Sequence, residues 1–334
     1  MNRRKLAICD QDKEYLAMLQ AYLSKKNPAG FKVVVFSSID EALLSSKEEG
    51  FAILLVSEGI YDTDVINITA QKTFILQEDG HADTAPYSSI PKFQSMEKLI
   101  GQVLDAFALD EECVSIEHKC QTEAKLVVFY APDRHKAQSV TALAAAQILS
   151  DMGNKVLYLS MQPFSGFEEL LGITYESDIT DFMYFVLKHS DKLPYKLEGI
   201  KKTIHGVDYL PPALDFGDLL SITEEEWKRC AASLIHSGGY SHVVMDLTET
   251  CKGFYFFLET CESLYVLSAR DAFSKAMYGQ FERLMKSKEL GAIIRKSICF
   301  DVPAGWESAA SNLAQLSASA LGAHMKGIME QNGL

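Results

Sequence analysis

Residues 124–166 read AKLVVFYAPDRHKAQSVTALAAAQILSDMGNKVLYLSMQPFSG, and this stretch decides the fold of the second half of the chain. Two apolar runs, at 126–130 and 156–159, flank a short polar turn and an alanine-rich stretch at 139–152. Short apolar runs are typical of buried strands, and the alanine-rich stretch is typical of a helix. The segment therefore predicts a strand, a loop, a helix and a second strand, which is the setting that phosphate-binding loops require.

The loop before this helix resembles the phosphate-binding loop of the ParA/MinD group of P-loop ATPases, which has the form K-G-G-x-G-K-[TS]. The seven positions of that pattern are filled here, in order, by Asp133, Arg134, His135, Lys136, Ala137, Gln138 and Ser139. Only Ser139 matches, at the position that the resemblance assigns to the metal-side hydroxyl. Gln138 stands where the resemblance places the lysine that grips the phosphates, and no glycine is present. The loop thus has the position of a nucleotide-binding loop but lacks most of the residues that bind the phosphates.

The missing residues have a predictable effect on nucleotide affinity. Glycine permits both the backbone angles and the close approach that such a loop needs, and a non-glycine residue in a left-handed conformation costs roughly 1–2 kcal/mol. Losing the lysine contact costs roughly 1.5–3 kcal/mol more, so affinity falls by about a thousandfold. We therefore expect no cofactor, or ATP with magnesium bound only weakly. As an alternative, the basic cluster at 134–136 lies beside a helix N-terminus and can attract an anion.

Two further motifs of the ATPase group occur with altered residues. In ParA/MinD proteins the strand after the loop's helix ends in D-x-D, whereas KVLYLSMQPF places Ser160 and Gln162 at those positions. A later strand, HVVMD at 242–246, ends in Asp246, which the resemblance equates with the Walker-B-like aspartate. Ser139 and Asp246 are then all that remains of a metal site. Two such ligands without the lysine or the acidic pair rarely hold a magnesium–nucleotide complex.

The first part of the chain alternates between strand-like and helix-like segments, which predicts a parallel sheet with helices on both faces. Its landmarks resemble a response-regulator receiver domain of flavodoxin/CheY-like fold. Asp10 and Asp12 match the acidic pair after the first strand, and Lys92 matches the lysine after the fifth. Val56 stands where the family has its phosphate-accepting aspartate. The resemblance therefore implies a pseudo-receiver that serves as a docking domain and retains an acidic pocket of Asp10, Asp12 and Lys92.

The chain of 334 residues is long enough for two doubly wound α/β domains with parallel sheets. We expect a receiver-like domain at 1–108, a polar linker at 109–122, and a ParA/MinD-like P-loop NTPase fold at 123–334. A formal net charge of −13 argues against a nucleic-acid partner. No apolar run reaches the roughly 18–20 residues of a transmembrane helix. Seven cysteines without a C-x-x-C pair predict reduced thiols in a cytoplasmic protein.

A receiver-like domain followed by a ParA/MinD-like domain resembles the TadZ/CpaE pilus-assembly proteins, and the resemblance covers nearly the whole chain. It implies a cytoplasmic, homodimeric scaffold that marks a cell pole or assembly site and recruits the secretion ATPase of a Tad/Flp pilus. With its nucleotide motifs degraded, this chain is expected to be a pseudo-ATPase that acts through protein–protein contacts. The alternative is an ATP-binding dimerisation switch with weak or slow hydrolysis. A phosphorylated response regulator ranks last, because Val56 stands at the acceptor position.

Overall fold

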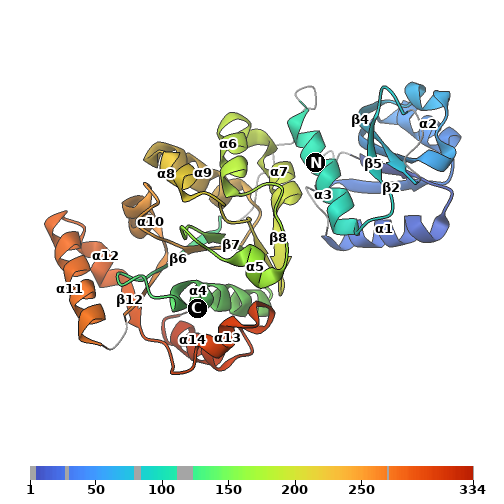
Figure 1. The fold of residues 1–334 in the computed structure, drawn as a ribbon. Helices are drawn as coiled ribbons and strands as arrows, with labels where there is room; N and C mark the ends of the chain where they lie inside the picture. The colour runs from blue at the N-terminus through green and yellow to red at the C-terminus, as the bar shows by residue number, and fades with distance from the viewer. Residues whose placement is uncertain (1–4, 27–29, 79–83, 111–122, 269–270, 334) are drawn as a thin grey trace. The chain divides into compact units, whose positions relative to one another are not determined.

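The computed structural model describes residues 5–26, 30–78, 84–110, 123–268 and 271–333 (Figure 1). The chain divides into two compact units. The first unit comprises Met1–Glu117 together with Asp191–Gly199, and the second comprises His118–Ser190 and Ile200–Leu334. Both are built on largely parallel sheets, which confirms the α/β class. The boundary expected at residue 108 stays a prediction, and residues 111–122 of the expected linker lie outside the described residues.

The first unit contains a five-stranded sheet in the order β2-β1-β3-β4-β5, in which neighbouring strands are parallel. Its strands are β1 Lys5–Cys9, β2 Lys32–Phe36, β3 Phe51–Ser57, β4 Ala70–Gln77 and β5 Ser88–Pro91. The order 2-1-3-4-5 is one of the two common doubly wound orders, in which functional groups gather at the carboxyl ends of the strands. Strand β3, FAILLVS, is buried along its whole length because helices and loops cover both faces of the sheet centre.

Three α-helices accompany this sheet among the described residues: α1 Lys13–Lys26, α2 Ile39–Glu48 and α3 Met96–Leu109. Between β3 and β4 the chain forms two short 3₁₀ helices instead, η2 Glu58–Ile60 and η3 Thr63–Asn67. Serine side chains cap two of the helices, since Ser38 accepts a hydrogen bond from the backbone N–H of Glu41 and Ser95 accepts one from Lys98.

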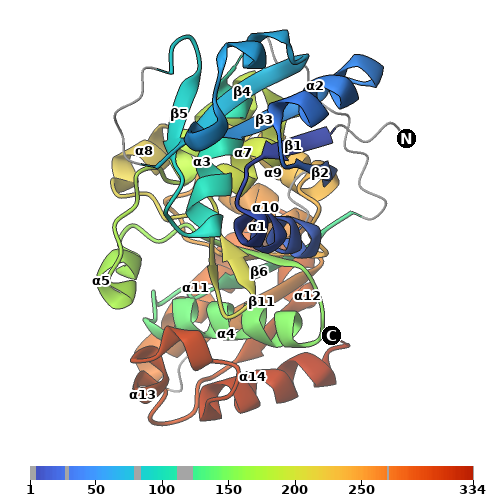
Figure 2. The same ribbon diagram turned by 90° about the vertical axis from the view of Figure 1, so that its right-hand side faces the viewer.

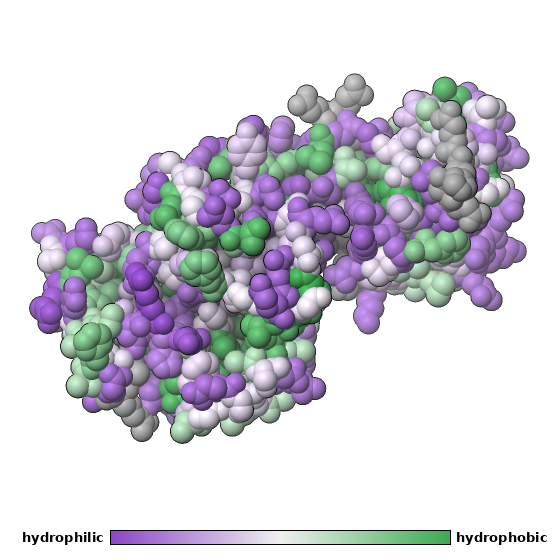
Figure 3. All heavy atoms as spheres, in the orientation of Figure 1, coloured by the Kyte–Doolittle hydropathy of each residue, from purple (hydrophilic) through white to green (hydrophobic). Residues whose placement is uncertain are grey.

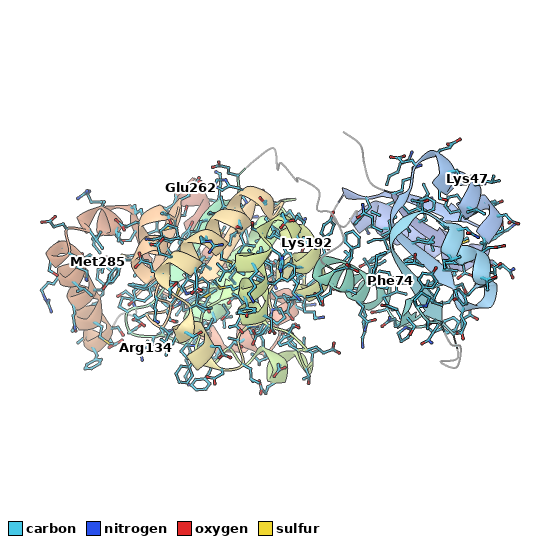
Figure 4. The ribbon with its side chains drawn as sticks, turned by 90° about the horizontal axis from the view of Figure 1, so that it is seen from above. Lys47, Phe74, Arg134, Lys192, Glu262 and Met285 are labelled. Atoms are coloured by element: carbon cyan, nitrogen blue, oxygen red, sulfur yellow. The ribbon has the colours of Figure 1, made fainter. Side chains whose placement is uncertain are left out.

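A segment from far along the sequence completes the first unit. The 3₁₀ helix η4 Ser190–Lys192 leads into α7 Leu193–Ile200, and residues 191–199 belong to this unit. Tyr195 is fully buried there, with its ring centroid 5.2 Å from that of Phe107 and 5.7 Å from that of Phe31. Lys192 (Figure 4) donates to the carbonyl of Asp110, and Lys196 Nζ lies 2.7 Å from Asp105 Oδ1. The first unit is therefore discontinuous in sequence.

The second unit contains a seven-stranded sheet in the order β12-β11-β6-β10-β7-β9-β8. All neighbouring strands are parallel except the edge pair β8–β9, which is antiparallel. The strands are β6 Lys125–Tyr130, β7 Val156–Ser160, β8 Lys202–Ile204, β9 Val207–Tyr209, β10 His242–Asp246, β11 Ser263–Leu267 and β12 Ser297–Phe300. The strands predicted at 126–130, 156–159 and 242–246 are confirmed.

Helices cover both faces of this sheet (Figures 1 and 2). One face carries α4 Ala137–Asp151, α13 Glu307–Ala310 and α14 Ala320–Gln331, and the other carries α6 Ile179–Lys188 and α9 Glu224–Ser237. The remaining helices are α5 Phe167–Leu171, α8 Phe216–Ser221, α10 Phe254–Thr260, α11 Ala272–Ser287, α12 Gly291–Lys296 and the 3₁₀ helix η5 Leu313–Gln315.

Helix α4 is buried on nearly all sides, since it lies between the sheet and α14. Its alanine-rich sequence suits this position, because small side chains let the neighbouring elements approach closely. Gln147 in this helix is fully buried and satisfies both ends of its amide: Nε2 donates to the carbonyl of Leu313 at 2.6 Å, and Oε1 accepts from the N–H of Ser317 at 3.0 Å. These two bonds tie α4 to the segment 313–317 that leads into α14.

Candidate functional site

The carboxyl ends of β6, β10 and β7 lie side by side and form the edge on which the predicted site residues meet. In the register of the sheet, Asp246 is opposite Phe129 on one side and Ser160 on the other. The loop 131–136 and the start of α4 close this edge from one side. A cavity of about 310 Å³ remains, and Gln138, Ser139 and Gln162 are among the residues that line it.

Four backbone N–H groups of the loop and of the first turn of α4 donate to the loop's own atoms. The N–H of Arg134 donates to the carbonyl of Ala131 at 2.9 Å, and the N–H of His135 donates to Asp133 Oδ1 at 3.2 Å. The next two donors are used in the same way, since Ala137 N–H donates to His135 Nδ1 at 3.1 Å and Gln138 N–H to the His135 carbonyl at 2.9 Å. A P-loop offers such N–H groups to phosphate oxygens. Here Asp133 and His135 occupy two of those donors.

Arg134 (Figure 4) retains the backbone conformation that glycine usually provides. Its φ of 53° lies in the left-handed region, and it stands at a glycine position of the ParA/MinD pattern. The side chain is 78% exposed, with Nε 3.6 Å from Glu249 Oε2. Glu249 Oε1 also accepts from the Tyr130 hydroxyl at 2.6 Å. Burial, followed by this hydrogen bond and the Glu249 charge, raises the pKa of Tyr130.

Arg134→Gly is expected to leave the protein as stable as the wild type or more stable by up to about 1 kcal/mol, because relief of the left-handed strain outweighs the added freedom of the unfolded chain. The exposed contact with Glu249 contributes little. Arg134→Val is expected to be less stable than the wild type, since a β-branched residue tolerates positive φ poorly. Urea midpoints of the three proteins measure this order. An equal loss for both variants would mean that the Arg134 side chain, not its backbone, matters.

Gln138 joins the strand ends to the helix instead of pointing toward a ligand. It is buried, and its Nε2 lies 2.5 Å from Asp246 Oδ1, 2.8 Å from the carbonyl of Leu247 and 3.2 Å from that of Phe129. Gln162 Nε2 donates to the same Asp246 Oδ1 at 2.7 Å, and the Tyr158 hydroxyl lies 3.3 Å from Oδ2. Two neutral amides and a phenol thus surround the carboxylate that the resemblance assigns to a metal site.

Asp246 is completely buried, and this burial decides its ionisation. Loss of hydration raises the pKa of Asp246, while hydrogen bonds from Ser139, Gln162, Gln138 and Tyr158 lower it by less. The predicted metal pair is brought together, since the Ser139 hydroxyl lies close enough to Asp246 to lower the pKa of that carboxyl. Its carboxylate oxygens are already bound to amide and hydroxyl donors, however, so the residues do not fit a magnesium–nucleotide complex. Among the described residues, no group of three or more His, Cys, Asp and Glu side chains could hold a metal ion.

In the first unit the predicted acidic pocket assembles in part. Lys92 is buried and its Nζ lies 2.7 Å from Asp10 Oδ2, 2.8 Å from Glu78 Oε1 and 3.3 Å from Ser57 Oγ. Burial lowers the pKa of Lys92, but hydrogen bonds and charges from Asp10 and Glu78 outweigh it and leave that pKa raised. Asp12 is exposed and instead caps α1, because its Oδ1 accepts from the N–H groups of residues 14 and 15.

Four residues that contact Asp246 or Lys92 have no role in the sequence-based predictions. The sequence indicates only a lost acid at Gln162 and a buried strand position at Tyr158, yet both side chains reach Asp246. Glu78 and Ser57 complete the Lys92 cluster, with Ser57 Oγ donating to Glu78 Oε1 at 2.8 Å. Val56, by contrast, packs in the hydrophobic core, so the residue of β3 that faces Lys92 is Ser57. An amide two residues beyond a strand end is the signal that could have identified Gln162.

Among solved structures, the chain is similar to ATPases of the ParA and MinD groups. A ParA family ATPase from Chlorobium tepidum TLS is 18% identical with a TM-score of 0.49, and the match covers 63% of this chain and 99% of that one. The septum site-determining protein MinD from Pyrococcus horikoshii OT3, complexed with Mg-ADP, is 14% identical with a TM-score of 0.45, covering 63% and 96%. A plasmid partition protein from Borrelia burgdorferi is 13% identical with a TM-score of 0.45, covering 63% and 98%.

These similarities concern the fold and assign no activity to this chain. A search of protein-family models found no match to the sequence, and a search of curated proteins found none either. Within the residues that the structure describes, no helix is both long enough and apolar enough to cross a membrane.

Proposed function

We propose that this protein is a pseudo-ATPase of the ParA/MinD class that works as a scaffold through protein–protein contacts. We call the edge formed by the carboxyl ends of β6, β10 and β7 the phosphate edge. The observation that carries the proposal is that side chains of the protein itself are hydrogen-bonded to one another along this edge. Gln138 stands at the lysine position and binds Asp246, which also accepts from Gln162. Phosphate binding would have to displace these hydrogen bonds and free the loop donors held by Asp133 and His135.

The more specific form of this proposal is a cytoplasmic, homodimeric protein of the TadZ/CpaE type. Such a protein would position Tad/Flp pilus machinery, including its secretion ATPase, at a cell pole or at the membrane through its partners. The strand order 2-1-3-4-5 of the first unit and its Asp10–Lys92 pair support a receiver-like domain. With Ser57 rather than an aspartate facing Lys92 at the end of β3, that domain is proposed to dock partners without being phosphorylated.

The alternative function is an ATP-binding dimerisation switch with weak or slow hydrolysis. One observation favours it: the cavity of about 310 Å³ lies at the phosphate edge and is lined by Ser139 together with Arg134 and Lys136. Both basic side chains are exposed beside the N-terminus of α4, where an anion would be attracted. In this form Arg134 and Lys136 would supply the positive charge that is missing at the lysine position, where Gln138 stands.

A titration with fluorescent ATP in the presence of Mg²⁺ separates the two functions. We expect no saturable binding by the wild-type protein up to about 1 mM nucleotide, a loss of the thousandfold order that the missing contacts predict. The double variant Ala137→Gly, Gln138→Lys restores two family residues and is expected to bind more tightly than the wild type. Micromolar binding by the wild type that disappears in Ser139→Ala would overturn the pseudo-ATPase proposal and establish the switch. No gain in the double variant would count against the alignment of the loop.

A further inference from the structure

A second cavity in the second unit is apolar inside and acidic around its rim. It has a volume of about 400 Å³ and lies between the loop 163–166, helix α5, the start of α6 and the loop 212–214. Its apolar walls come from Pro163, Phe164, Phe167, Tyr175, Pro212, Ala213 and Leu214. We call this cavity and its rim the acidic groove. It adjoins the phosphate edge, because residues 163–165 and Phe167 line both cavities.

Two large apolar side chains of the acidic groove are almost fully exposed. Phe164 is 84% exposed and Leu214 is 83% exposed. Phe216 at the start of α8 packs edge-on against Phe164, with ring centroids 5.9 Å apart, and is itself 40% exposed. Hydrophobic spheres lie among hydrophilic ones on the face of the second unit that carries α5 (Figure 3). Exposed apolar side chains that gather around a cavity and are bordered by polar groups mark an interaction surface.

The charge around the groove has a single sign. Its acidic lining residues are Glu168, Glu169, Glu176, Asp178 and Asp181, and no lysine, arginine or histidine lines it. In the described part of the chain none of these five carboxylates forms an ion pair. Asp178 and Asp181 are held in place by a capping box at the start of α6, and Glu168 Oε1 accepts from the N–H of Tyr175 at 2.8 Å. Several of the charges are therefore fixed in position yet uncompensated.

We propose that the acidic groove binds a partner protein through a segment in which apolar side chains alternate with lysine or arginine. The apolar residues would cover Phe164 and Leu214, and the basic ones would neutralise the rim. A second copy of this chain fits less well, because an isologous contact would bring two sets of five carboxylates together. The proposal rests on the scaffold function proposed above, since it specifies the chemistry of a protein partner.

The test uses the full chain and two fluorescein-labelled model peptides of 14 residues, one of leucine and lysine and one with glutamate in place of lysine. Fluorescence anisotropy at physiological salt is expected to show saturable 1:1 binding of the lysine peptide and none of the glutamate peptide. The double variant Glu169→Lys, Glu176→Lys is expected to weaken binding at least tenfold. Phe164→Ser, Leu214→Ser is expected to do the same without unfolding the protein, because both side chains are exposed.

A matched control separates the groove from the general negative charge of the chain. Glu48→Lys, Glu259→Lys changes the net charge equally at two exposed positions in the last turns of α2 and α10, where lysine is tolerated. Its affinity is expected to stay within twofold of the wild type. An equal loss in this control, full affinity in the serine variant, or binding of both peptides would overturn the proposal. So would a wild-type dimer that the serine variant converts to monomer, since a second copy would then occupy the groove.

Failure of this proposal and failure of the proposed function give different results. A protein that binds neither peptide specifically and also fails to bind nucleotide remains a pseudo-ATPase whose partner does not use the acidic groove. Saturable nucleotide binding overturns the pseudo-ATPase proposal whatever the peptides do.

Discussion

Asp246→Ala is expected to destabilise the second unit by roughly 3–5 kcal/mol, because the substitution leaves buried donors without an acceptor and opens a cavity. The Gln162 amide and the Tyr158 hydroxyl lose this acceptor, whereas the Gln138 amide keeps the carbonyls of Leu247 and Phe129. The effect can be measured by urea unfolding with tryptophan fluorescence. Both tryptophans of the chain, Trp227 and Trp306, belong to the second unit, so this signal reports that unit alone.

Asp246→Asn is expected to have the opposite effect at neutral pH. Burial raises the pKa of Asp246, so the folded state binds its proton more tightly than the unfolded state does. The stability that Asp246 contributes is fully present below its pKa in the unfolded chain, about 3.9, and is lost as pH rises through its pKa in the folded protein. Asparagine keeps an oxygen acceptor for the two amides and carries no charge. The variant should therefore become more stable than the wild type as pH rises.

The informative quantity is the difference in unfolding free energy between Asp246→Asn and the wild type across pH, because other titrating groups cancel in it. We expect this difference to increase above about pH 4 and to level off once Asp246 is ionised in the folded wild type. Asp218→Asn, at an exposed position in α8, is the matched control and should show no such trend. A difference that instead decreased as pH rose would mean that ionisation of Asp246 is favoured by folding, so that the buried anion itself stabilises the fold.

Local patterns were sufficient to predict the elements around the phosphate edge. The apolar runs and the alanine-rich helix of 124–166 appear as β6, α4 and β7, because hydrophobic periodicity is a property of neighbouring residues. The capping box that Thr223 and Glu226 form at the start of α9 is likewise encoded by residues close together in the sequence. The hydrogen bond between Gln138 and Asp246 joins residues 108 positions apart, and no local pattern encodes it. From the sequence, Gln138 and Gln162 are recognisable only as lost charges.

The pocket of the first unit shows how sensitive such an alignment is to a single residue. Side chains of a strand point alternately to its two faces, so Val56 and the next residue, Ser57, lie in different surroundings. Val56 packs in the core, whereas Ser57 reaches both Lys92 and Glu78. The sequence alone predicts the acceptor position at Val56. Glu78 follows the end of β4, and no motif of the resemblance points to it.

The sequence predicts that residues 191–199 belong to the second domain, since nothing in their composition points elsewhere. Their place in the first unit depends on Tyr195, whose buried ring meets two aromatic rings more than 80 residues earlier. Aromatic pairs of this kind add stability beyond the area they bury. Residues 191–199 are therefore needed to complete the core of the first unit. Their effect on the stability of that unit can be measured separately from the stability of the second unit.

Tyr195→Ala is expected to destabilise the first unit by roughly 3–5 kcal/mol, because it removes a fully buried ring between Phe31 and Phe107. Far-UV circular dichroism follows both units, whereas tryptophan fluorescence follows only the second. In the variant we expect an early urea transition in circular dichroism that fluorescence does not share. Tyr195→Phe keeps the ring and should stay close to the wild type.

Tyr184→Ala provides the matched control, since Tyr184 is 65% exposed on α6 in the second unit. It should leave both transitions close to their wild-type midpoints. If Tyr195→Ala instead shifted the two signals together, the segment 191–199 would stabilise the chain as a whole. If neither signal moved, the aromatic cluster would contribute little to the first unit. A separate early transition would show that the core of the first unit depends on residues encoded within the second half of the sequence.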